Sequence, residues 1–111
     1  MDKIARYRTL IQDTLIEDAQ IKPSLGEVES HLVFDTERDS YQLMYIGWDG
    51  TIRTHGAIIH VRLRNDKIWI EYDGTEEGIA IHFLEAGVPK EDIVLAFHSP
   101  LKRPYTGFAV A

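Results

Sequence analysis

The chain of 111 residues contains no cysteine. This absence excludes disulfide bonds, zinc sites built on thiolates and cysteine nucleophiles. Apolar runs are also short, and none approaches the roughly 20 residues that a membrane-spanning helix needs. The charged N-terminal stretch differs from a secretory signal peptide. We therefore expect a cytoplasmic protein, and the length and ordinary composition predict a single domain over residues 1–111.

Positive charge is scarce as well. The 12 lysines and arginines are outnumbered by 18 acidic residues, which gives a formal net charge of −6. Nucleic-acid binding needs a basic surface, because contacts to phosphate supply much of the affinity. We therefore expect no autonomous DNA binding by the surface as a whole, although a local basic cluster remains compatible with this charge.

Signatures of common enzyme classes are missing too. No serine lies in a nucleophile elbow, and Gly74 and Gly78 lack the Lys-Ser or Lys-Thr that completes a phosphate-binding loop. The five histidines show no i, i+4 helical pair of the zinc-protease type. We therefore predict a protein that is not an enzyme, with no catalytic residues, no metal and no cofactor.

The hydrophobic pattern that is present predicts an α+β fold. Apolar residues recur at helical spacing from Asp2 to about Ile21, and the period changes to two from Glu27 onward. Asp49-Gly50 and Asn65-Asp66 are hairpin turn signals between strands. The predicted order is helix, four-stranded antiparallel meander, helix and strand, in two layers with both helices on one face of the sheet. The predicted strands are 27–35, 41–48, 52–64, 67–72 and 93–97.

The second helix is predicted to follow directly on Asp73. Asp73 can act as its N-cap, and Glu76 then falls at the third helical position, where it can complete a capping box. An alternative is that Asp73, Glu76 and Glu77 hold a magnesium ion, as in a nuclease. The capping interpretation is favoured, because hard cations need several oxygens that converge from different elements.

The two faces of the predicted sheet differ in composition. One face is apolar enough to receive both helices, and we assign to it the following residues: Leu32, Phe34, Leu43, Tyr45, Ala57, Ile59, Val61, Leu63, Ile68 and Ile70. The other face is more apolar than a solvated surface should be. We predict that it forms the interface of a homo-oligomer, with a dimer expected, through Met44, Ile46, Trp48, Ile58 and Trp69. The alternative is that the C-terminal tail, Tyr105 to Ala111, covers this face.

A small basic and aromatic cluster lies near the C-terminus. It consists of Lys102, Arg103 and Tyr105, with His98 directly after the last strand. Such a cluster can bind phosphate or an acidic partner. The alternative is a solvated loop in which Arg103 pairs with a nearby carboxylate.

Several long stretches resemble one protein family. These are IWIEYDGTEEGIA, LEAGVPKEDIVLAFH and the C-terminal RPYTGFAVA, together with the opening MDKIARYRTLIQDTL and the central YQLMYIGWDGTIRTHGAIIHVRLRNDKIWI. They resemble the fdxN-element excision-controlling factor family, a cyanobacterial-type family of XisI-like proteins. The resemblance covers nearly the whole chain.

The resemblance implies a regulatory role. It suggests a non-enzymatic accessory factor for site-specific excision of a DNA element, which acts through protein–protein contacts. The implied partners are a site-specific recombinase and a second excision-control protein. Two alternatives stay open: a metal-dependent nucleic-acid-processing subunit that uses Asp73, Glu77 and His98, and a DNA-binding module that uses Lys102 and Arg103.

Overall fold

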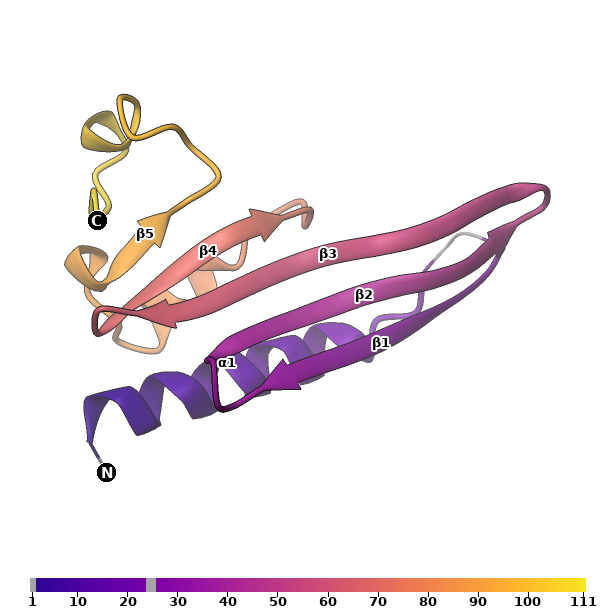
Figure 1. Cartoon of the computed structure of the whole chain (residues 1–111), viewed down its shortest axis with the longest axis horizontal. Helices are drawn as coiled ribbons and strands as arrows, with labels where there is room; N and C mark the ends of the chain where they lie inside the picture. Colours follow the sequence, from indigo (N-terminus) through magenta and orange to yellow (C-terminus); the bar gives the residue numbers. More distant parts are fainter. Residues whose placement is uncertain (1, 24–25) are drawn as a thin grey trace.

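The computed structural model describes residues 2–23 and 26–111 (Figure 1). Within these residues, no helix is both long and apolar enough to cross a membrane. Below, η denotes a 3-10 helix. The elements, in chain order, are α1 (Lys3–Ala19), β1 (Glu27–Asp35), β2 (Ser40–Asp49), β3 (Ile52–Arg64), β4 (Lys67–Asp73), α2 (Ala80–Glu85), η1 (Lys90–Asp92), β5 (Ile93–Leu95) and η2 (Arg103–Tyr105).

The strands form one five-stranded sheet in the order β1-β2-β3-β4-β5. Neighbours from β1 to β4 pair antiparallel, whereas β5 joins β4 in parallel. The α+β class is therefore confirmed, but the sheet is mixed and is not a four-stranded antiparallel meander. The predicted number of helices was also too small, because η1 and η2 join α1 and α2 in the described part of the chain.

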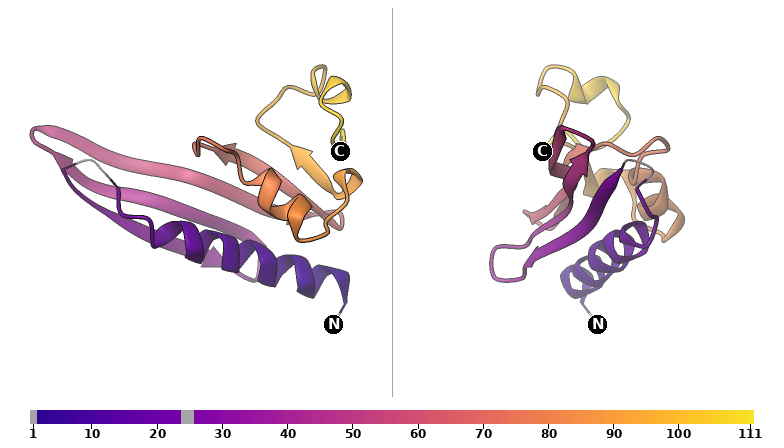
Figure 2. Two further views of the ribbon diagram at one scale, coloured as in Figure 1. Left: turned by 180° about the vertical axis from the view of Figure 1, so that it is seen from behind. Right: turned by 90° about the vertical axis from the view of Figure 1, so that its right-hand side faces the viewer.

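Both α-helices lie on the same side of the sheet (Figure 2). Asp2 begins α1 by accepting a hydrogen bond from the Ala5 N–H at 2.8 Å, as an N-cap residue does. The buried side chains of α1 and α2 meet those of the sheet in one hydrophobic cluster. Its members include Tyr7, Ile11, Leu15, Tyr41, Leu43, Ile59, Ile68, Ile70, Phe83 and Ile93.

A β-bulge in β3 changes the predicted face assignment. Leu43 pairs with Ile59 and Met44 pairs with Ala57, so Ile58 is the extra residue between these two pairs. Ala57 consequently shares a face with Met44, and Ile58 packs against the core cluster. The assignment of Ile58 to the open face was therefore wrong, because one inserted residue exchanges the faces of everything beyond it.

A second bulge lies in β4. His60 pairs with Tyr72 and Val61 pairs with Ile70, which leaves Glu71 as the extra residue. Tyr72 therefore lies on the open face with His60 and is exposed.

The second helix begins later than predicted. Asp73 is the last residue of β4, and α2 starts at Ala80 with Ile79 as its N-cap. Asp73 instead bridges the connecting loop: its Oδ2 accepts from the Ile79 N–H at 2.7 Å, and its Oδ1 accepts from the Thr75 N–H and hydroxyl. The predicted capping box with Glu76 was wrong, because Glu76 lies in this loop and not in a helical turn.

The last strand is also shorter than predicted and ends at Leu95. Beyond it, the chain turns through η2 and returns alongside β5, where Val94 and Ala109 form a parallel bridge. The Ala109 N–H donates to the Ile93 carbonyl at 2.9 Å. The C-terminal tail therefore borders the β5 edge, and in the described part of the chain no element covers β1 and β2 on the face opposite the helices (Figure 1).

Candidate functional site

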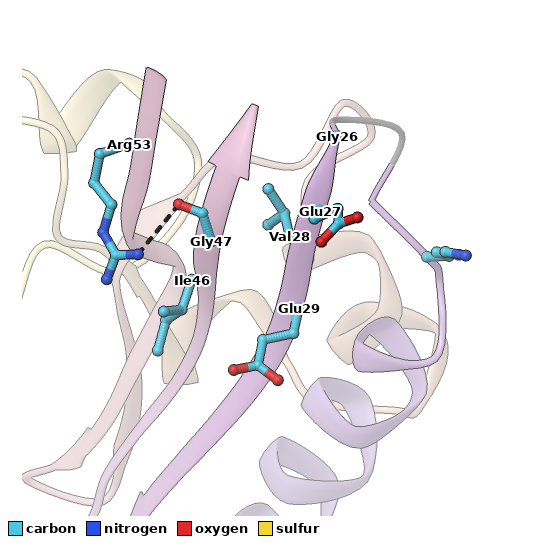
Figure 3. Close-up of a pocket in the computed structure, with 8 residues that line it drawn as sticks. Gly26, Glu27, Val28, Glu29, Ile46, Gly47 and Arg53 are labelled. Atoms are coloured by element: carbon cyan, nitrogen blue, oxygen red, sulfur yellow. Dashed lines mark hydrogen bonds between the residues drawn. The ribbon is translucent and has the colours of Figure 1, made fainter. Parts of the chain in front are cut away.

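The open face of the sheet carries an apolar row along β2. Met44 and Ile46 are half-buried, and Trp48 is 51% exposed. The guanidinium of Arg53, on β3, lies 5.2 Å from the centre of the Trp48 ring and donates to the Gly47 carbonyl at 3.3 Å (Figure 3). These contacts hold the aromatic ring in place without covering it.

Trp69 does not belong to this open row. The residue is only 6% exposed, and two guanidinium groups lie near the centre of its ring, that of Arg64 at 4.8 Å and that of Arg103 at 5.7 Å. Its Nε1 donates to the Arg64 carbonyl at 3.0 Å. Of the five residues predicted as an interface, Met44, Ile46 and Trp48 therefore lie on the open surface, whereas Ile58 and Trp69 are engaged within the fold.

Charged residues flank the apolar row in an ordered way that sequence reasoning missed. On one side, Glu27 and Glu29 of β1 pair with Trp48 and Ile46. On the other side, Arg53 and His55 of β3 pair with the same two β2 residues. Acidic, apolar and basic residues thus lie side by side across three strands. Figure 3 shows one residue of each kind, Glu29 on β1, Ile46 on β2 and Arg53 on β3. Strand register alone reveals this order, because the residues are far apart in sequence.

In the C-terminal cluster, Arg103 and His98 contact neighbouring residues of the fold, whereas Lys102 and Tyr105 are exposed. The guanidinium of Arg103 donates to the His98 carbonyl at 3.0 Å and to the Ala96 carbonyl at 3.2 Å. His98 lies against the Phe97 ring, with 4.6 Å between ring centres. Lys102 and Tyr105 are exposed, and Leu101, which was not predicted as a contact residue, is 87% exposed, as is Tyr105.

The acidic residues considered for metal binding do not converge. Both carboxylate oxygens of Asp73 accept hydrogen bonds from the loop before α2, and Glu76 and Glu77 are exposed. Asp92 accepts from the Tyr7 hydroxyl at 2.5 Å and pairs with Lys3 at 2.9 Å. Within residues 2–23 and 26–111, no three His, Asp or Glu side chains gather closely enough to hold a metal ion.

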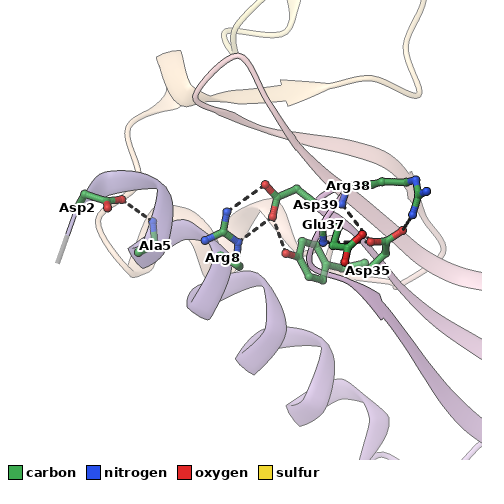
Figure 4. A network of polar contacts seen from close by, with 8 residues as sticks. Asp2, Ala5, Arg8, Asp35, Glu37, Arg38 and Asp39 are labelled. Atoms are coloured by element: carbon green, nitrogen blue, oxygen red, sulfur yellow. Dashed lines mark hydrogen bonds and ion pairs between the residues drawn. The ribbon is translucent and has the colours of Figure 1, made fainter.

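Two polar networks tie α1 to other parts of the fold, one to the turn before β2 and one to η1. In one, Asp39 accepts from Arg8 and from the buried Tyr41 hydroxyl (Figure 4). Burial, together with the hydrogen bond to Asp39, raises the pKa of Tyr41 to about 12. Burial likewise raises the pKa of Tyr7 to about 12, with its hydrogen bond to Asp92 adding to the effect. These tyrosines are structural donors, because neither ionises near neutral pH.

These observations define a small α+β protein with a one-sided helical layer, whose accessible features are exposed apolar and charged surfaces. The family model described as XisI protein matches residues 1–110. The chain belongs to the XisI family, as its sequence motifs predicted.

Two solved structures are similar over nearly their whole length. The crystal structure of the fdxN element excision controlling factor XisI from Anabaena variabilis ATCC 29413 shares 40% identity, with a TM-score of 0.87 over 99% of this chain and 100% of that chain. A XisI-like protein from the same organism shares 38% identity, with a TM-score of 0.90 over 96% and 98% of the two chains. Among curated proteins, none matches the chain.

Proposed function

We propose that this chain is a non-enzymatic accessory protein in the site-specific excision of a DNA element, and that it acts by binding other proteins. Membership of the XisI family supports the excision role, since a relative at 40% identity is described as an fdxN element excision controlling factor. The proposed place of action is the cytoplasm. The proposed partners are a site-specific recombinase and a second excision-control protein.

The observation that carries the binding role is the C-terminal loop, defined here as residues 99–105. It presents Leu101 and Tyr105, each 87% exposed, beside the exposed Lys102. Large apolar side chains that stay exposed together are typical of protein–protein contact sites, and tyrosine is enriched in such sites.

Hydrogen bonds order this loop before any partner arrives. Arg103 holds it to the carbonyls of Ala96 and His98, and the Ser99 carbonyl accepts from the N–H groups of Lys102 and Arg103. Thr106 Oγ1 donates to the Arg103 carbonyl at 2.8 Å. A preordered loop loses little conformational entropy on binding, so its apolar side chains can contribute most of their burial to affinity.

The charge balance favours a protein partner over DNA. Arg103 is committed to backbone carbonyls and to the Trp69 ring, which leaves Lys102 as the exposed cation of the predicted cluster. One lysine on a chain with a net charge of −6 offers weak attraction to a polyanion.

An excision assay tests the proposal. Cells would carry a plasmid with a DNA element between its recombination sites, the recombinase and the second control protein, with or without this chain. We expect excision to depend on the chain and to be lost when Leu101→Ser and Tyr105→Ser are combined. Ile21→Ser is the control, because Ile21 is an apolar side chain that is 65% exposed just beyond the end of α1.

Two results would contradict the proposal. Excision that is independent of the chain would remove the accessory role. Excision that persists with the double variant, while the variant folds with an unchanged melting temperature, would remove the C-terminal loop as the contact site.

A further inference from the structure

We infer that the open face of the sheet binds a second copy of this chain, in a twofold dimer with β2 packed over β2. This inference goes beyond the proposed function, which uses the C-terminal loop and the β5 side of the molecule. The dimer surface, called here the β1–β3 face, consists of Glu27 and Glu29 of β1, Met44, Ile46 and Trp48 of β2, and Arg53 and His55 of β3.

The first argument is the apolar row at the centre of this face. Met44, Ile46 and Trp48 alternate along β2, and Ala57 adds a small side chain beside Met44. The helices lie on the opposite face and the C-terminal tail lies at β5, so neither covers the row (Figure 2). Sheets that pack face to face with nearly aligned strands bury this kind of row between them.

The second argument is the register of the charges. Glu27, Trp48 and Arg53 lie at one level across the three strands, and Glu29, Ile46 and His55 lie two residues further along. Each level therefore has an acid on one side of the apolar row and a basic residue on the other. A face with this order is complementary to itself.

The symmetry that satisfies this order is specific. Consider a twofold axis parallel to β2, midway between two facing sheets. It leaves each residue at the same position along the strand direction and exchanges the β1 side of the sheet with the β3 side. β1 of one protomer then lies over β3 of its partner, so that Glu27 faces Arg53 and Glu29 faces His55. Both contacts occur twice, as an isologous interface requires.

The other face-to-face arrangement is disfavoured by charge. A twofold axis perpendicular to the strands, within the interface plane, places β1 over β1 and β3 over β3. Acidic residues then face an acidic strand and basic residues face a basic strand, and such like-charge contacts oppose association. The charge order thus selects one arrangement of the two copies.

Charge exchange tests the dimer. Wild-type protein at tens of micromolar should have twice the monomer mass by light scattering. One variant combines Glu27→Arg with Glu29→Arg, and the other combines Arg53→Glu with His55→Glu. Each should be monomeric, because each places like charges opposite one another. An equimolar mixture of the two should recover the mass of a dimer, because β1 of either chain then meets an opposite charge on β3 of the other.

Control variants keep the test specific. Glu85→Arg combined with Glu91→Arg makes the same charge change at exposed positions outside the β1–β3 face and should leave the dimer intact. All four charged positions are exposed, so the variants should retain the wild-type circular dichroism and melting temperature.

Three results would overturn the inference. A wild-type monomer would show that a second copy does not bind. If that monomer associates only with the second excision-control protein, the β1–β3 face is assigned to that protein. Dimers that survive in both charge variants would place the contact elsewhere, for example at the free edge of β1. Monomeric variants that fail to associate when mixed would exclude the proposed pairing of β1 with β3.

Discussion

Arg8 of α1 binds Asp39 in the turn between β1 and β2 through two parallel contacts, Nε to Oδ1 at 2.8 Å and Nη2 to Oδ2 at 3.1 Å (Figure 4). Asp39 also accepts from the Tyr41 hydroxyl at 2.6 Å. The hydrogen bond from Arg8 is the largest influence on Asp39 and lowers the pKa of its carboxyl, with Tyr41 adding to the effect and burial opposing it. One carboxylate therefore links the first helix, a turn and the core.

This relationship predicts a pH dependence. A carboxyl whose folded pKa is lowered contributes stability that is fully present above its unfolded pKa, near 3.8, and is lost as the pH falls through the folded pKa. Urea unfolding at pH 7 and pH 3 should therefore show a smaller acid-induced loss in Asp39→Asn than in the wild type. Asp2→Asn, at an exposed helix cap, is the control. An equal loss in wild type and Asp39→Asn would remove Asp39 from the acid response.

Gly47 provides a second prediction. It has a φ of 156°, and a Cβ there would lie 2.1 Å from the Glu27 carbonyl oxygen on the neighbouring strand. Gly47→Ala should therefore lower the free energy of unfolding by roughly 1–3 kcal/mol or more, through backbone strain and displacement of β1. Gly56→Ala is the matched control, because its Cβ would meet nothing within 4 Å. Chemical denaturation measures both, and equal stability of the two variants would contradict this account.

The loop before α2 provides a third prediction. Asp73→Ala removes hydrogen bonds to the Ile79 N–H at 2.7 Å and to the Thr75 hydroxyl at 2.6 Å. Because these bonds involve a carboxylate, the free energy of unfolding should fall by about 2 kcal/mol. Glu76→Ala, which changes an exposed side chain in the same loop, should have little effect. A large loss with Glu76→Ala would restore the capping-box interpretation.

The apolar row predicts the effect of introducing charge. Ile46→Glu combined with Trp48→Glu should convert the wild-type dimer to a monomer, because four carboxylates would meet across the twofold axis. Light scattering measures the change, with Ile52→Glu as a control at an exposed apolar residue of the same hairpin. If the double variant is still a dimer, the interface lies on another surface, and Tyr105–Ala111 is the next segment to test.

The charge of the chain predicts its behaviour with DNA. Purified protein should not shift generic duplex DNA in a gel at physiological salt, because a net charge of −6 opposes binding to a polyanion. A salt-sensitive shift at submicromolar protein that disappears in Lys102→Glu would contradict the protein-binding role and favour the DNA-binding alternative.

Sequence alone determined the family, the first helix and the long strands of this fold. The helical period of Ile4, Tyr7, Ile11 and Leu15 predicted α1, and alternation predicted strands, including β3 with its observed ends at Ile52 and Arg64. Such patterns are readable because each element must bury one face, and its period follows from its own backbone geometry. The same pattern indicated Met44, Ile46 and Trp48 as an exposed apolar row.

Only the tertiary structure decided the register in which the strands pair and the face of the sheet on which each side chain lies. The bulges at Ile58 and Glu71 moved Ala57 and Tyr72 to the open face, and the packing of Arg103 and Arg64 removed Trp69 from it. The alignment of Glu27 with Arg53 across Trp48 is likewise a property of paired strands. Register joins residues that are distant in the chain, and one inserted residue reverses a face, so local periodicity cannot determine it.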